Sequence, residues 1–142
     1  MNTKLFLAAI GGAVASFLLG WLVFGMLLAD FFKTNTIVYE GLTKEPPVLW
    51  AVFLGGLCST TLLAWIFSKM GITSFMKGAT TALWIGFLLT AWYYLSMYAF
   101  MNLFTSKLML TELVVESLFT AVIGGIVGAI LGMGKKPVTT TA

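Results

Sequence analysis

The sequence predicts an all-α membrane protein, a single bundle of four transmembrane helices. Hydrophobic residues make up 60% of the 142 residues and charged residues only 9%, whereas soluble domains carry about 25% charged residues. The mean hydropathy of the chain is +1.02. Four apolar stretches have about the length of 20 residues that a helix needs to cross a bilayer. So few charges could not cover a soluble globule, and lipid is therefore the expected solvent.

The four spans follow one another along one domain that takes in the whole chain, residues 1–142. We expect them at residues 5–29, 48–67, 79–101 and 113–133, with a polar tail at 134–142. The first span could be mistaken for a secretory signal, because Lys4 precedes it and Ala13-Val14-Ala15 resembles a cleavage site. Apolar residues continue through Leu28, however, so we expect an uncleaved span.

Polar and turn-forming residues separate the spans. Asp30 is expected to stop the first helix, since a carboxylate at a helix C-terminus opposes the helix dipole. The "KEPP" stretch at 44–47 suits the start of the second span, because proline is tolerated in a first helical turn. Gly71 in "SKMG" is a plausible stop for that span. The fourth span is interrupted only by Glu116 and Ser117.

The lysines predict the orientation of the spans. With four spans, the N-terminus, the second loop and the tail lie on one side of the membrane. That side carries no acid and five lysines, which are Lys4, Lys69, Lys77, Lys135 and Lys136. All five acids lie on the other side, beside the remaining three lysines. By the positive-inside rule, we expect a bacterial inner-membrane protein with both termini in the cytoplasm.

Small residues recur every four positions in each span, as is typical of membrane helices that pack closely. The expected packing residues are Gly12, Ser16, Gly20, Gly55, Gly86, Gly124, Gly128 and Gly132. Two interpretations are open. The favoured one places these residues in contacts within one bundle. In the other, one glycine stripe, above all that of the fourth span, forms the interface of a homodimer.

Glu116 is the clearest candidate for a functional residue, because ionisable groups inside a membrane are costly and mark sites by default. It lies four residues after Glu112 and four before Thr120, on the ridge that continues into the glycine stripe. Lys107 is a plausible counter-charge. Glu112 and Glu116 are therefore expected in a ligand or ion pathway.

Aromatic residues of the third span lie at the same outer level. Tyr94 and Tyr98 are one helical turn apart and share a face. With Glu116, and with Trp21 behind, they could line a pocket for a small organic or cationic ligand. The alternative, which we favour, is an ordinary aromatic belt, because Tyr and Trp collect at membrane interfaces without any ligand.

The composition argues against several other functions. The chain has no histidine, so it cannot form a Ser-His-Asp set or a histidine metal site. Cys58 is the only cysteine, so it forms no intrachain disulfide or cysteine cluster. The lysines are scattered over short loops and make no basic stripe for nucleic acid. We expect no enzyme, no cofactor and no metal.

The chain resembles small bacterial four-helix membrane proteins of the Bacteroidetes type that are classed as a domain of unknown function. The resemblance rests on "FLLGWLVFGMLLADFF" at 17–32, "PPVLWAVFLGGL" at 46–57 and "AWIFSKMGI" at 64–72. In that family an aromatic residue precedes the second glycine of the first-span motif, and Phe24 fills this place. The resemblance implies a fold and a location but no reaction.

Two other four-helix families fit less well. Small multidrug exporters keep an acid within the first span, and this first span has none before Asp30. Small fluoride channels rely on an arginine-bearing motif, and this chain has no arginine. We therefore expect a structural, binding or accessory subunit that contacts the bilayer and another membrane protein. The alternative is a small homodimeric transporter or channel with Glu116 in its pathway.

Overall fold

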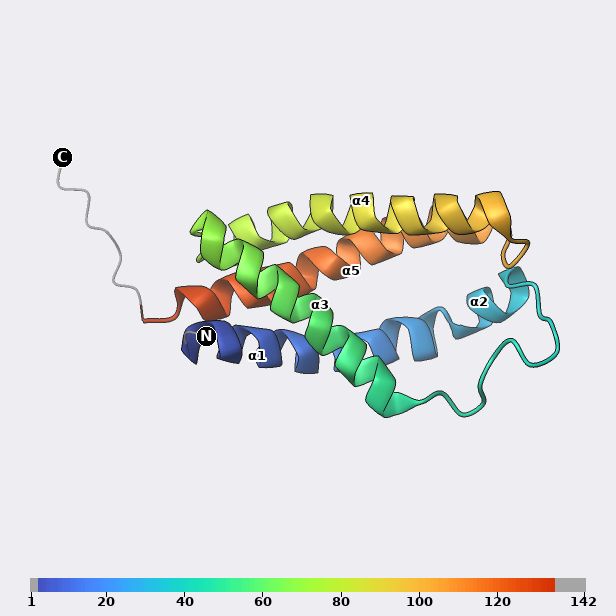
Figure 1. Cartoon of the computed structure of the whole chain (residues 1–142), viewed down its shortest axis with the longest axis horizontal. Helices are drawn as coiled ribbons and strands as arrows, with labels where there is room; N and C mark the ends of the chain where they lie inside the picture. Colours follow the sequence, from blue (N-terminus) through green and yellow to red (C-terminus); the bar gives the residue numbers. More distant parts are fainter. Residues whose placement is uncertain (1–2, 135–142) are drawn as a thin grey trace.

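The computed structural model describes residues 3–134. Lys135, Lys136 and the rest of the predicted polar tail lie outside the described residues. The elements are α1 (Thr3–Gly20), the wider π-helical segment η1 (Trp21–Leu27), α2 (Ala29–Asn35), α3 (Leu49–Met70), α4 (Phe75–Phe100) and α5 (Ser106–Gly132). Four helices are long and apolar enough to cross a membrane: Thr3–Leu27, Leu49–Met70, Phe75–Phe100 and Ser106–Gly132. The predicted all-α bundle with four spans is thus confirmed (Figure 1).

The last two spans begin earlier than the sequence predicts. α5 begins at Ser106 rather than at 113, because the Thr105 hydroxyl caps it and accepts a hydrogen bond from the Leu108 amide at 3.2 Å. α4 begins at Phe75, after Ser74, whose side chain accepts from an amide in the first turn. The predicted stop at Gly71 is confirmed: this glycine ends α3 with φ +67°, a left-handed conformation that favours glycine.

The predicted role of Asp30 as a stop signal is wrong. The first span ends at Leu27 in η1, and the short helix α2 then begins at Ala29 with Asp30 in its first turn. A carboxylate there lies at the positive end of the helix dipole and is favourable. α2 was not predicted, because its polar residues lie in what reads as a loop. Its end is held by backbone hydrogen bonds to the α4–α5 turn, from Ile37 N to Leu103 O at 2.8 Å and from Thr105 N to Asn35 O at 3.0 Å.

α5 is the element that joins the bundle together. α4 runs beside α5 along its length, and α1 packs against both α3 and α5 (Figure 1). α3 crosses α5 obliquely. Its C-terminal end approaches the start of α4, and its N-terminal end turns away from α4 (Figure 1). α3 therefore packs on α1 and α5 but not along α4.

The glycines of α5 hold α4 at backbone distance. A Cβ atom at Gly124 would meet Ala82 and the Gly78 carbonyl oxygen, and one at Gly128 would lie 2.6 Å from the Ser74 carbonyl oxygen. Likewise, Gly86 of α4 lies against Thr120. These glycines therefore lie at the contact between α4 and α5, and Gly132 lies against Thr73 in the same way. Because α4 fills the stripe of the fourth span, a second copy that used this stripe would have to displace α4.

A second small-residue contact joins α1 to α3. A Cβ atom at Gly12 would lie 2.7 Å from a Val127 methyl group and 3.0 Å from Thr60. The Thr60 hydroxyl is fully buried and donates to the Ala9 carbonyl oxygen at 2.8 Å. Gly12 therefore lies in close contact with α3 and α5, and Ser16 lies close to Gly56 of α3, where an added Cβ would be 3.6 Å from the serine oxygen.

Two of the predicted packing glycines make no close approach. A Cβ atom at Gly20 would touch only Phe119, at an ordinary 3.7 Å, and one at Gly55 would meet nothing within 4 Å. Gly55 therefore makes no close contact within the described bundle, and its packing role stays a prediction. Gly55 belongs to an exposed row of small residues on α3 with Ala51 and Ser59, and the neighbouring row through Gly56 faces α1 instead. We call Ala51, Gly55 and Ser59 the open row.

Candidate functional site

A cavity of about 210 Å³ lies between α1, α3 and α5. Residues of α1, α3 and α5 line it, and most are small or polar: Ser16, Gly55, Gly56, Ser59, Leu63, Glu116, Phe119, Thr120 and Ile123. Two members of the open row are among them. Ser16 lies near the middle of the first span, Thr3–Leu27. The cavity is therefore at membrane mid-depth, where polar groups are costly.

Of the residues that the structure describes, Glu116 is the one charged residue that lines this cavity. α5 presents it on the same ridge as Thr120, one turn further on, as the spacing of four predicts. The hydroxyl-bearing residues Ser16 and Ser59 reach the cavity from the other two helices. Lys107, the predicted counter-charge, lies instead over the Phe31 ring, 5.4 Å from its centroid. Among the described residues, the cavity lining therefore places hydroxyl groups, and no cationic side chain, around Glu116.

Glu112 lies one turn away, buried between α4 and α5 with 5% of its surface exposed. The Tyr94 hydroxyl donates a hydrogen bond to Glu112 Oε2 at 3.1 Å. Its other oxygen, Oε1, is buried and has no hydrogen-bond partner. A buried acceptor without a partner costs free energy, so this carboxyl group is held in place by the α4–α5 packing at a cost to stability.

The predicted aromatic pocket around Glu116 is not assembled. Tyr94 contacts Glu112 rather than Glu116. Tyr98 is half exposed and accepts a hydrogen bond from the Ser106 hydroxyl at 3.4 Å. Trp21 is 64% exposed on η1 and does not line the cavity. The structure therefore brings Tyr94 together with Glu112, and Glu116 with small hydroxyl residues, while Trp21 faces outward as an interfacial tryptophan would.

These polar groups form a row that ends inside the membrane. From the α4–α5 turn it runs through the Tyr98–Ser106 contact and the Tyr94–Glu112 pair to Glu116 in the cavity. Beyond Thr120, the glycines of α5 lie against the α4 backbone. The row of polar groups thus extends from one end of the bundle to about the middle of the membrane and ends there.

The Glu116 carboxyl group and its hydroxyl neighbours could bind a ligand or a side chain that enters the cavity. A carboxyl group inside a membrane accepts hydrogen bonds strongly when ionised and favours a cationic or donor group. Among residues 3–134, no group of three or more His, Cys, Asp or Glu side chains is placed to hold a metal ion.

The four apolar helices define the class of this chain as a multi-pass membrane protein. Comparisons with protein-family models, with curated proteins and with solved structures give no match. The resemblance to small bacterial four-helix proteins is therefore supported in its architecture alone, and no family is identified.

The sequence contained a signal for the open row. α3 carries two rows of small residues at intervals of four, one starting at Ala51 and the other at Gly56. The two rows point about 100° apart, because they are offset by one residue. A helix with two such faces has room for two close neighbours. In the structure only the second row has one, α1.

Proposed function

We propose that this protein is a non-enzymatic binding or accessory subunit, and that a transmembrane helix of another membrane protein docks between α3 and α4. The observation that carries this proposal is the open row of α3, which is exposed and runs directly into the Glu116 cavity. Small residues allow a second helix backbone to approach closely.

Glu116 gives the docking its chemical specificity. Lipid tails offer nothing to a carboxylate at membrane mid-depth, so the group gains most from a partner that donates hydrogen bonds. The matching helix carries a basic or hydroxyl-bearing side chain at the level of Glu116. Its own small residues lie against Gly55, where added atoms meet nothing within 4 Å.

Copurification from mild detergent tests this proposal with Gly55→Leu. Because the site is open, we expect the variant to fold with wild-type stability and to lose its partner, as the leucine fills the open row. Leu95→Phe is the matched control, since Leu95 is exposed and lies on the face of α4 opposite the buried Gly86. Retention of the partner by Gly55→Leu, or its equal loss in Leu95→Phe, would contradict the proposal.

A transporter or channel with Glu116 in its pathway is the second candidate. The row of polar groups from Ser106 to Glu116 favours it, because such a row could give protons or cations access to mid-depth. The row stops at the α4–α5 glycine contact, so a second copy would have to complete the route. Flux into proteoliposomes that Glu116→Gln abolishes would support this candidate, and wild-type flux equal to that of empty vesicles would remove it.

The lysines support an inner-membrane location with both termini in the cytoplasm. Lys4, Lys69 and Lys77 lie at the end of the bundle where α1 begins and α3 passes to α4. The acids Asp30, Glu40 and Glu45 belong to the long connection at the opposite end. By the positive-inside rule, the end of the bundle that carries Lys4, Lys69 and Lys77 is cytoplasmic. Reporter fusions after residue 142 that are active only in the periplasm would contradict this orientation.

A further inference from the structure

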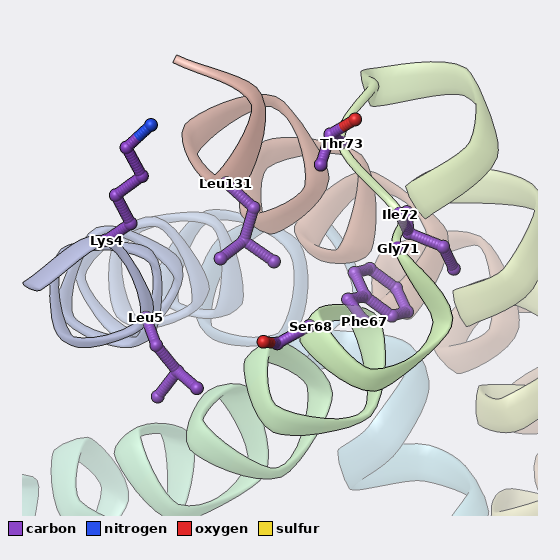
Figure 2. Close-up of a pocket in the computed structure, with 8 residues that line it drawn as sticks. All are labelled: Lys4, Leu5, Phe67, Ser68, Gly71, Ile72, Thr73 and Leu131. Atoms are coloured by element: carbon purple, nitrogen blue, oxygen red, sulfur yellow. The ribbon is translucent and has the colours of Figure 1, made fainter. Parts of the chain in front are cut away.

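A second cavity, of about 120 Å³, opens at the opposite end of the bundle from the α4–α5 turn. We propose that it binds the phosphate of an anionic phospholipid headgroup. It lies where the start of α1, the α3–α4 turn and the end of α5 meet (Figure 2). It is separate from the Glu116 cavity, and the two cavities have no lining residue in common.

The lining of this cavity is half polar and half apolar. Figure 2 shows Lys4 on one side, on α1, and Ser68 across from it on α3, with Thr73 at the rim. Apolar side chains form the rest of the wall: Leu5, Phe67, Ile72 and Leu131. A phospholipid presents the same two surfaces at this depth, a charged phosphate beside an apolar glycerol and acyl region.

Lys4 is positioned to hold an anion. Its ammonium group donates to the Met133 carbonyl oxygen at 2.8 Å, which fixes the side chain beside the end of α5. An ammonium has three N–H donors, so two remain for a phosphate. Among residues 3–134, no acid lines the cavity. Lys69 and Lys77 at the same end add to the positive field, although neither lines it.

The position of the cavity favours a lipid over a free anion. Its residues lie in the first turn of α1, in the last turns of α3 and α5, or in the α3–α4 turn, at the level where headgroups meet water. Basic pockets between transmembrane helices at this level bind anionic lipid headgroups. A free phosphate would gain nothing from the apolar half of the wall.

Thermal unfolding of the full chain in mild detergent, with added phosphatidylglycerol, tests the proposal. We expect the lipid to raise the unfolding midpoint of the wild type. In Lys4→Gln the half-saturating lipid concentration should rise about five- to tenfold, as expected for the loss of one lysine near a charged surface. Lys69→Gln is the matched control, because it removes an equal charge at the same end without touching the cavity.

Two further measurements make the test decisive. Ser68→Ala should weaken binding about threefold through loss of a hydroxyl donor, and it carries the test if Lys4→Gln fails to fold. Equal weakening by Lys69→Gln would show diffuse surface charge and overturn the site. Equal stabilisation by phosphatidylcholine, or by inorganic phosphate without lipid, would overturn the assignment to an anionic lipid headgroup.

Discussion

Replacing Gly128 with alanine tests the contact on which the arrangement of the bundle depends. A Cβ atom at Gly128 would lie 2.6 Å from the Ser74 carbonyl oxygen and 3.2 Å from the Gly78 Cα atom. Both neighbours are backbone atoms, so neither can turn aside as a flexible side chain would. To make room, the start of α4 must move away from α5 by roughly half an ångström or more, since carbon–carbon contacts are optimal at about 3.5–4.0 Å.

We expect Gly128→Ala to lower the free energy of unfolding by about 1–3 kcal/mol, the usual cost of overpacking. Gly55→Ala is the matched control, because a Cβ atom there meets nothing within 4 Å. Any gain in helix propensity from glycine to alanine, about 1 kcal/mol in water, applies to both variants. The assay is unfolding in mixed micelles, followed by tryptophan fluorescence. Equal stability of the two variants would refute the close α4–α5 contact.

Three further predictions concern polar contacts. Thr60→Val should cost about 0.6–1.5 kcal/mol of unfolding free energy, because it removes the buried hydrogen bond to the Ala9 carbonyl oxygen; an unchanged unfolding curve would contradict that bond. Tyr94→Phe should cost about 1–3 kcal/mol, since it leaves both oxygens of Glu112 without a hydrogen-bond partner, and a double-mutant cycle with Glu112→Leu should show positive coupling. Hydrogen exchange should find the Ile37 amide protected by its bond to the α4–α5 turn, and exchange as fast as in an unfolded peptide would contradict the docking of α2.

Much of the fold could be predicted because the bilayer imposes a simple rule on sequence. A helix must be apolar over about 20 residues to cross it, so the four spans are visible as apolar runs. The start of α5 was misplaced because Glu112 is polar yet buried. Hydropathy alone cannot distinguish a polar residue in a loop from one that faces a neighbouring helix.

The candidate site could be predicted only in part, for a geometric reason. Glu116 stood out because a carboxylate within a span is costly. Its surroundings depend on the oblique crossing of α3, which the periodicity of one helix does not specify. That crossing brings Ser59 to the cavity, whereas Trp21 lies exposed on η1 and does not line it. The glycine stripe of α5 likewise could not reveal that its partner is α4 rather than a second copy.

Site-specific photo-crosslinking in native membranes tests the docking of a partner helix most directly. A photoreactive amino acid in place of Ser59, in the open row beside the Glu116 cavity, should form one discrete adduct with another membrane protein. The adduct should weaken in Glu116→Gln and disappear in Gly55→Leu, while the same probe at Leu95 should give none. Labelling of lipid alone from position 59, or an adduct that neither substitution changes, would contradict the docking of a partner helix between α3 and α4.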